Sequence, residues 1–196
     1  VSEHSFPRRV IPTSDAAVAL GLTDTVEPDA QIMTDVITPV QECLDGLDAA
    51  IIKSNVILDV SRAGVRAAET NSGNLITDAY LYTYDQLAAV NGLPPLDETV
   101  IAVQNGGGIR QNAGDVLPVD GFVPGKTTRA NTLDVLAFLT NTVTAVQNVT
   151  PEEMKQILER SASRLPGAGG QFLQIGGFTV EYDISRTAQV IDNDGT

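Results

Sequence analysis

The sequence predicts an α/β (α+β) fold, because segments typical of helices and of strands alternate irregularly along its 196 residues. β-Branched or apolar runs that are typical of strands occupy 55–60, 99–104, 142–149 and 172–182. Helical patterns occupy 28–52, 70–89, 133–139 and a stretch that begins at residue 150. Hydrophobic residues make up 42% of the chain, which is enough for a substantial core.

The helix predicted over 28–52 rests on one apolar stripe whose members recur every three or four residues. These residues are Ile32, Val36, Val40, Leu44, Leu47 and Ile51. Pro39 lies inside the stripe and has no backbone N–H to donate. A kink or break in the helix is therefore predicted at this residue.

The later helices are predicted from faces and caps. In 70–89 the predicted apolar face consists of Leu75, Ala79 and Tyr82. Thr150 and Glu153 are spaced as a capping box, with a proline between them at the first helical position. The expected buried face of that helix is Met154, Ile157 and Leu158. In the strand predicted over 172–182, the residues Phe178, Val180 and Tyr182 share one face.

The composition argues against several classes of function. A formal net charge of -13 disfavours binding to nucleic acid and to anionic membranes. A local arginine cluster can still bind a small anion against this acidic background. The only cysteine is Cys43 and the only histidine is His4, so we expect no internal disulfide, no histidine-rich metal site and no Ser-His-Asp site. No apolar run approaches the length of a membrane span.

A glycine-rich segment, Asn105–Arg110, directly follows the strand predicted over 99–104. Three consecutive glycines let backbone N–H groups approach a ligand closely, and the arginine supplies a planar fork for phosphate or carboxylate. A tight turn with a solvated arginine explains the same pattern. The spacing matches neither the dinucleotide-binding fingerprint nor a P-loop.

A second polar segment contains Arg62 and Arg66, which can point the same way if the chain turns between them. Glu69, Asn71 and Asn74 follow and can cap the next helix and anchor the loop. A solvated basic pair beside a helix cap is the alternative interpretation. Neither segment, taken alone, indicates which interpretation is correct.

Taken together and in order, these segments resemble the C-terminal domain of the 5'-nucleotidase family, which includes bacterial periplasmic UDP-sugar hydrolases and animal ecto-5'-nucleotidases. The resemblance rests on Arg62–Ala79, on Asn105–Arg110 and on Gly170–Phe178, which is similar to a third signature of the family. It covers residues 30–190 approximately.

The resemblance implies a set of substrate-binding residues and no catalytic or metal-binding residue in this chain. The implied set is Arg62, Arg66, Asn105, Gly107, Gly108, Arg110, Phe138 and Asn141. Phe138 corresponds to a phenylalanine that stacks on the base, with Asn141 as its polar partner, although the proline and glycine of the family's motif are missing here. Phe138 as a plain core residue is the alternative.

The resemblance also implies a domain organisation. We expect 1–27 to be a tail or linker, 28–54 an interdomain connector helix, and 55–196 the substrate-recognition domain, incomplete at its C-terminal end. A second stacking phenylalanine and an acidic ribose ligand would lie beyond Thr196. A divalent metal pair (Zn, Mn or similar) is expected in a preceding N-terminal domain, with no cofactor in this chain.

The function implied is substrate binding in a metal-dependent phosphohydrolase of nucleotides, periplasmic or extracellular. A non-catalytic secreted module that binds nucleotides or sugar phosphates is the alternative, and the residues that precede Val1 in the gene would distinguish the two. The sequence does not indicate which nucleotide is bound.

Overall fold

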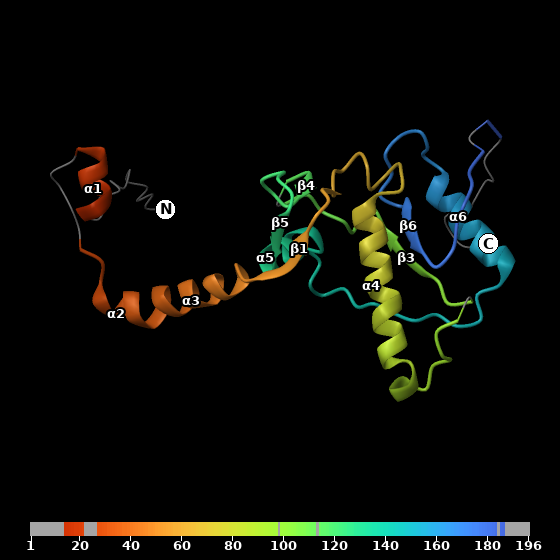
Figure 1. Ribbon diagram of the computed structural model, residues 1–196, viewed down its shortest axis with the longest axis horizontal. Helices are drawn as coiled ribbons and strands as arrows, with labels where there is room; N and C mark the ends of the chain where they lie inside the picture. Colours follow the sequence, from red (N-terminus) through yellow and green to blue (C-terminus); the bar gives the residue numbers. More distant parts are fainter. Residues whose placement is uncertain (1–13, 22–26, 98, 113, 184, 187–196) are drawn as a thin grey trace, which may run out of the picture. The chain divides into compact units, whose positions relative to one another are not determined.

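The computed structural model describes residues 14–21, 27–97, 99–112, 114–183 and 185–186, and the chain divides into two units, 1–48 and 49–196 (Figure 1). His4, most of the predicted tail 1–27 and the residues from 187 onward lie outside the described residues. The predicted α/β class is confirmed, because helices and strands alternate along the second unit. No helix in the described part of the chain is long and apolar enough to cross a membrane.

The first unit contains α1 (Ser14–Leu20) and a helical run made of α2 (Ala30–Ile32), η1 (Met33–Ile37) and α3 (Thr38–Leu47). The Asp29 side chain caps this run by accepting from the N–H groups of Gln31 and Ile32, at 2.9 and 3.0 Å. The stretch η1 is π-helical, with the Thr38 N–H donating to the Met33 carbonyl. η1 ends two residues before Pro39, and α3 continues through the proline, so the hydrogen-bonding pattern changes there without a break in the helical run. A kink at Pro39 stays a prediction.

The predicted C-terminal boundary of this helix is wrong. The helix ends at Leu47, and β1 (Ala50–Ser54) follows as a strand. β1 pairs antiparallel with β5 (Gly125–Thr128), and two of its residues, Ile51 and Ile52, are β-branched. Hydrogen bonding to a distant strand has outweighed the helical spacing of the apolar residues. The role of 28–54 as an interdomain connector stays a prediction.

Two further strand pairs complete the second unit. β2 (Leu58–Asp59) pairs with β4 (Val116–Leu117), and β3 (Ala102–Asn105) pairs with β6 (Leu173–Gly176), both antiparallel. The strands predicted over 55–60 and 172–182 are thus much shorter than expected. At the end of β6, Gly177 has a φ of 85°, and this left-handed residue turns the chain out of the extended run.

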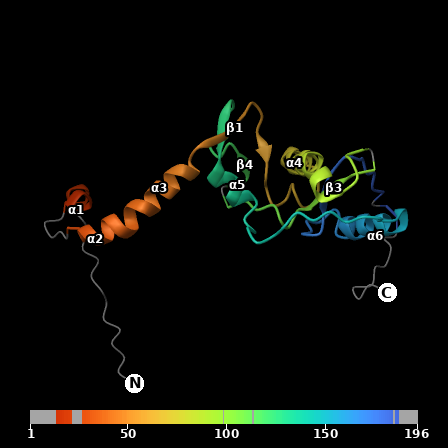
Figure 2. The ribbon, with the colours of Figure 1, turned by 90° about the horizontal axis from the view of Figure 1, so that it is seen from below.

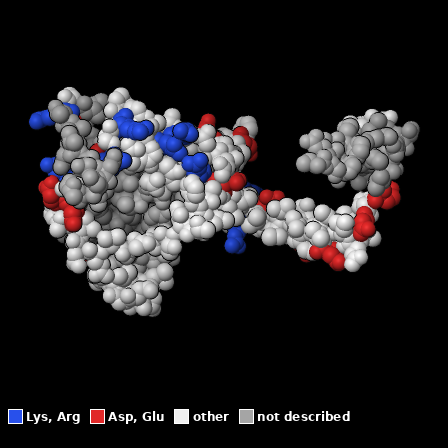
Figure 3. Space-filling model, turned by 180° about the vertical axis from the view of Figure 1, so that it is seen from behind, with Lys and Arg blue, Asp and Glu red and all other residues white. Residues whose placement is uncertain are grey.

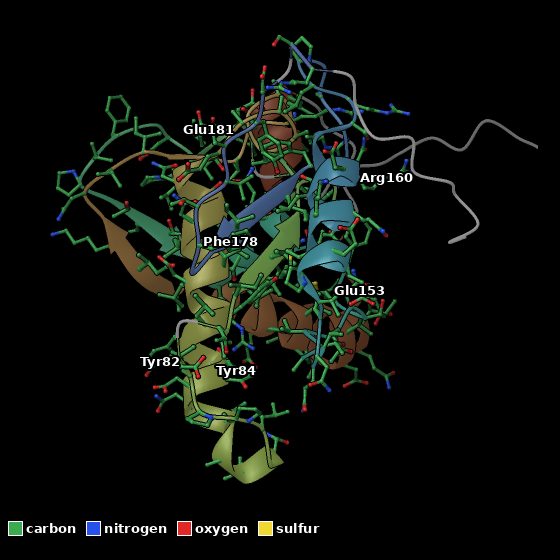
Figure 4. All side chains as sticks on the ribbon, turned by 90° about the vertical axis from the view of Figure 1, so that its right-hand side faces the viewer. Tyr82, Tyr84, Glu153, Arg160, Phe178 and Glu181 are labelled. Atoms are coloured by element: carbon green, nitrogen blue, oxygen red, sulfur yellow. The ribbon has the colours of Figure 1, made fainter. Side chains whose placement is uncertain are left out.

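Helices cover both faces of the β3–β6 pair. α4 (Asn71–Leu87, followed by η2, Ala89–Asn91) lies on one face and α6 (Pro151–Ala162) on the other, as Figures 1, 2 and 4 agree. The predicted capping box of α6 is present: Thr150 accepts from the Glu153 N–H, and the Glu153 carboxylate accepts from the Thr150 N–H. These hydrogen bonds lower the pKa of Glu153. α5 (Arg129–Val135) follows β5 directly.

The face that α4 buries is not the apolar one predicted. Leu75 and Tyr82 are 42% and 68% exposed, whereas Ser72, Gly73 and Thr77 are buried. Small polar residues face the sheet because the helix approaches it closely, and the Thr77 hydroxyl donates to the Ile175 carbonyl at 3.1 Å. Figure 4 shows Tyr82 and Tyr84 on the C-terminal half of α4.

Three other predicted elements differ from the structure. Residues 142–149 form no strand and are exposed throughout, so their alternating pattern has no strand partner among the described residues. The helix expected at 133–139 instead spans Arg129–Val135, because Thr128 caps it with Asn131. In α6, Ile157 is 41% exposed, and the buried residue of that helix is Ser161.

The core of the second unit lies directly beneath the two polar segments singled out in the sequence. Its buried members come from β2 and the chain after it, the glycine-rich segment, β4 and α5: Leu58, Val60, Val65, Ile109, Leu117 and Val135. Val65 and Ile109 are 0% and 2% exposed. The next residue after each is an arginine of the predicted site, so core packing fixes the backbone from which both arginines extend.

Candidate functional site: an arginine cluster beside a glycine-rich turn

The glycine-rich segment is a tight turn that packs against two other loops. The N–H groups of Gly106 and Gly107 donate to the carbonyls of Phe172 and Gly170, at 2.6 and 2.8 Å. The Gly108 N–H donates to the Asn105 carbonyl at 2.8 Å. The expectation that these N–H groups would face a ligand is therefore wrong, because each already donates within the protein. Whether Gly107 and Gly108 touch a substrate through other atoms stays a prediction.

Close approach of the backbone is the physical reason for the glycine at 106. A Cβ on Gly106 would overlap the Val65 carbonyl oxygen and lie 3.2 Å from the Arg66 Cα. A Cβ on Gly107 would lie 2.9 Å from the Gly170 carbonyl oxygen. Glycine therefore brings the strand end of β3 into contact with the loop that carries Arg66.

The loop that carries Arg62 and Arg66 is a turn held by local hydrogen bonds. The Asp59 carboxylate accepts from the Ser61 N–H at 2.8 Å, and the Val65 N–H donates to the Ser61 carbonyl at 3.0 Å. The Arg62 N–H donates to the Gln111 side-chain oxygen at 2.9 Å. The connection predicted between Arg62 and Arg66 is confirmed as such, and it is joined to the chain beyond Arg110.

The structure brings the three predicted arginines into one cluster. Burial lowers the pKa of the Arg66 guanidinium, and the positive charges of Arg62 and Arg110 lower it further. The Arg66 Nε is buried and has no hydrogen-bond partner among the described residues. Within the described part of the chain, none of the three forms an ion pair with an Asp or Glu.

Figure 3 shows a face of the second unit on which several basic side chains lie. The arrangement suits an anion, because guanidinium groups bind phosphate or carboxylate oxygens through paired N–H donors. It also explains how a chain of net charge -13 presents a local positive field.

Phe138 lies at the edge of this cluster. Its ring is 48% exposed, so it is not a plain core residue. The Arg110 Cζ lies 5.5 Å from the centroid of the Phe138 ring, and the Arg110 Nη1 donates to the Gly107 carbonyl at 3.1 Å. Arg110 therefore joins the glycine turn to the aromatic ring.

The two predicted asparagines, Asn105 and Asn141, differ in their hydrogen bonds. The Asn105 Nδ2 donates to the Gly170 carbonyl at 3.2 Å, and its Oδ1 accepts from the Gln104 Nε2 at 3.1 Å. Asn105 thus already bridges two loops. Asn141 is exposed, and its N–H donates to the Phe138 carbonyl at 2.9 Å. No described contact joins Asn141 to the arginines.

Sequence reasoning missed the residues that support the cluster from behind. The Tyr80 hydroxyl donates to the Gln104 side-chain oxygen at 2.7 Å, and burial raises the pKa of this phenol. Gln174 is 1% exposed and bonds to the loop that carries Arg66. Gln174 lies within Gly170–Phe178, the segment that is similar to a third signature of the family, so the sequence offered a signal for it. No feature of the sequence indicated a role for Tyr80.

The described residues include no cluster that could hold a metal ion, and the two concavities described below lie away from the arginines. No group of three or more His, Cys, Asp or Glu side chains among them lies close enough to hold a metal ion. A concavity of about 580 Å³ lies between the chain at 146–149 and α6, and one of about 730 Å³ lies between α6 and 180–186. Neither is lined by a predicted site residue.

These features define a class of protein: an α/β domain in which an arginine cluster lies beside a strand–glycine turn and an exposed phenylalanine lies at the edge of that cluster. The sequence profile of the family described as "5'-nucleotidase, C-terminal domain" matches residues 50–193. The chain belongs to this family. The match begins five residues before the boundary predicted at residue 55.

Individual relatives agree with this assignment. The chain is 36% identical over 139 residues to the human 5'-nucleotidase, a match that covers 68% of this chain and 21% of that protein. It is 34% identical over 133 residues to the trifunctional nucleotide phosphoesterase protein YfkN of Bacillus subtilis (strain 168), covering 68% of this chain and 8% of YfkN.

A solved structure supports the fold as well. The crystal structure of the 5'-nucleotidase precursor from Thermus thermophilus superposes with a TM-score of 0.56 at 28% identity, covering 82% of this chain and 28% of that one. The matches thus span only a fraction of these longer proteins.

Proposed function

We propose that this chain is the substrate-recognition part of a 5'-nucleotidase-like phosphohydrolase that removes phosphate from nucleotides. Arg62, Arg66 and Arg110 would bind the phosphate and ribose end of the nucleotide, and Phe138 would stack on the base. The observation that carries the proposal is the arginine cluster, in which the pKa of Arg66 is lowered by burial and by its two neighbours.

Electrostatics supports an anionic ligand at this cluster. Three like charges that lack acidic partners repel one another, and an anion placed among them removes that repulsion while filling their donor groups. The buried Arg66 Nε, which has no hydrogen-bond partner among the described residues, gains most from such a ligand. A phosphate group offers the several acceptor oxygens that three guanidinium groups require.

The position of Phe138 supports a base next to the phosphate and ribose. The ring contacts Arg110 by a cation–π interaction and is half exposed. A nucleotide contains both an anionic end and a planar ring, so one molecule can occupy the arginines and the aromatic ring together. Stacking of a base on an aromatic side chain contributes about 1–3 kcal/mol.

The hydrolytic step belongs elsewhere in this proposal. We propose that the divalent metals (Zn, Mn or similar) lie in a preceding domain; among the described residues of this chain no group of side chains fits a metal ion. Such metals activate water and stabilise the phosphoryl group. This chain binds and orients the nucleotide. We further propose a periplasmic or extracellular location, which the likeness to a 5'-nucleotidase precursor supports.

Calorimetric titration of the full-length protein with AMP and with adenosine, in a chelator that prevents turnover, tests the binding role. Arg110→Met should weaken AMP binding by about 2 kcal/mol, the typical loss for a charge-assisted hydrogen bond. Adenosine binding should change less. Arg160→Met is the matched control, since it removes the same charge from α6 (Figure 4). Equal loss in both variants, or loss in neither, contradicts the assignment of Arg110.

Phosphate release from AMP, ADP and UDP-glucose in the presence of Zn²⁺, Mn²⁺ or Co²⁺ tests the catalytic part. The full-length protein should turn over at least one of these compounds, and the 196-residue chain alone should turn over none. If the full-length protein binds nucleotides and hydrolyses none of them, the chain belongs to a secreted binding module instead.

A further inference from the structure

Gln174 occupies the most densely hydrogen-bonded buried position behind the arginine cluster. It lies in β6, is 1% exposed, and uses both ends of its side-chain amide. The Gln174 Nε2 donates to the Val65 carbonyl at 3.0 Å and to the Ala68 carbonyl at 2.8 Å. Its Oε1 accepts from the Thr70 N–H at 3.0 Å. One side chain therefore binds three points of the loop that joins β2 to α4.

The two carbonyls that Gln174 holds flank Arg66 in the sequence. Val65 precedes Arg66 directly and Ala68 follows two residues later, so the backbone on both sides of the arginine is fixed to β6. The Arg66 carbonyl itself accepts from the Gly169 N–H at 2.9 Å. These contacts leave the backbone at Arg66 little freedom to rotate, and they set the direction in which its guanidinium extends.

Only an amide of this length satisfies the site. The hydrogen bonds of Gln174 to the Val65 carbonyl and the Thr70 N–H are buried, so these two groups need a donor and an acceptor within the protein, while the bond to the Ala68 carbonyl is half-buried. An apolar side chain would leave all of these groups without partners. The helix is shaped to fit the amide as well, because a Cβ at Gly73 would overlap the Gln174 Oε1.

We propose that Gln174 is a positioning residue for anion recognition: it holds the loop so that Arg66 extends into the cluster with Arg62 and Arg110. This inference rests on the proposed function, in which Arg66 binds the phosphate and ribose end of a nucleotide. Gln174 does not touch the ligand. It acts through Arg66, so its removal lowers affinity for the charged ligand and leaves the contribution of Phe138 intact.

A double-mutant cycle in the full-length protein separates positioning from general stability. The variants are Gln174→Met, Arg66→Met and their combination, titrated with AMP and with adenosine in a chelator. Gln174→Met should weaken AMP binding about tenfold, the equivalent of one hydrogen bond, and change adenosine binding by less than about twofold. In the Arg66→Met background, Gln174→Met should have no further effect on AMP, because the two residues act as one unit.

Gly73→Ala provides a second variant in case Gln174→Met does not fold. The added methyl group displaces the Gln174 amide without removing any hydrogen-bonding group, and alanine is a better helix former than glycine. It should reproduce the loss of AMP affinity. Gln171→Met is the matched control for the first variant: Gln171 lies three residues before Gln174 and donates to the Ser163 hydroxyl. Gly46→Ala, where a Cβ meets nothing within 4 Å, is the control for the second.

The outcomes distinguish failure of the positioning role from failure of the proposed function. If Arg66→Met weakens AMP binding while Gln174→Met and Gly73→Ala do not, the positioning role is wrong and the proposed function stands. Additive losses in the double variant, or equal losses for AMP and adenosine, also overturn the positioning role. If Arg66→Met leaves AMP binding unchanged, the proposed function of the cluster fails, and the role of Gln174 fails with it.

Discussion

Gly106→Ala tests whether the glycine-rich turn exists for packing or for ligand contact. A methyl group at this position would overlap the Val65 carbonyl oxygen and come within 2.8 Å of the carbonyl carbon. These are backbone atoms of a buried residue, so the clash cannot be relieved by rotating a side chain. The turn and the arginine loop must move apart instead.

The expected change in folding free energy for Gly106→Ala follows from two opposing effects. Overpacking of this kind costs about 1–3 kcal/mol of folding free energy. Replacing glycine by alanine returns about 0.4–1 kcal/mol, because the unfolded chain loses freedom. We therefore expect a net loss of about 1–2 kcal/mol, equivalent to a melting temperature lower by about 2–8 °C for a chain of this size.

Thermal melting and urea unfolding of the full-length protein measure this loss. Gly170→Ala is the control: its Cβ would face the same turn, but at an ordinary contact distance of 3.6 Å from the Gly107 Cα. It should melt close to the wild type. Gly106→Ala could instead leave stability unchanged or raise it and weaken AMP binding. That result would refute packing as the reason for the glycine, and it would favour ligand contact through the N–H groups of the turn.

Three further results are expected. Phe138→Leu should weaken adenosine and AMP binding alike, by about 1–3 kcal/mol in calorimetric titration, with little change in melting temperature because the ring is half exposed. Ile109→Ala should lower the free energy of unfolding in urea by about 2–5 kcal/mol, since Ile109 is 2% exposed in the core. The pKa of Tyr80 is raised in the folded state, so folding stability should fall as pH rises above about 10, where the unfolded phenol ionises first. Tyr80→Phe should show a smaller fall over the same pH range; an identical pH dependence would contradict this origin.

The fold class and the segments of the site were predictable because their signals are local. The capping box at Thr150 and Glu153 needs only residues within one helical turn, and it is present as predicted. Short polar segments rich in Gly and Arg were likewise recognisable, and the structure joins Arg62, Arg66 and Arg110 as a cluster.

The errors arose where distant parts of the chain decide the structure. Ile51 and Ile52 fit a helical stripe in sequence, but hydrogen bonding to β5 makes them a strand. The buried face of α4 is polar because Thr77 bonds to Ile175 across the interface, a contact between residues far apart in the chain. The sequence left two interpretations of the glycine-rich segment open, ligand contact and a tight turn, and the structure shows a turn whose N–H groups bond to Gly170 and Phe172. Pairing partners of this kind are not encoded in local spacing.

The same long-range contacts explain how the protein keeps three positive charges together. Repulsion between charges at a protein surface is on the order of 1 kcal/mol. Burying a valine or isoleucine contributes about 1.5–3 kcal/mol, and Val65 and Ile109 each directly precede an arginine of the cluster. Core packing therefore outweighs the repulsion and holds the cluster in place before a ligand arrives. If the proposed function holds, an anion meets arginines whose backbone is already fixed, so less of its binding free energy is lost to ordering the loops.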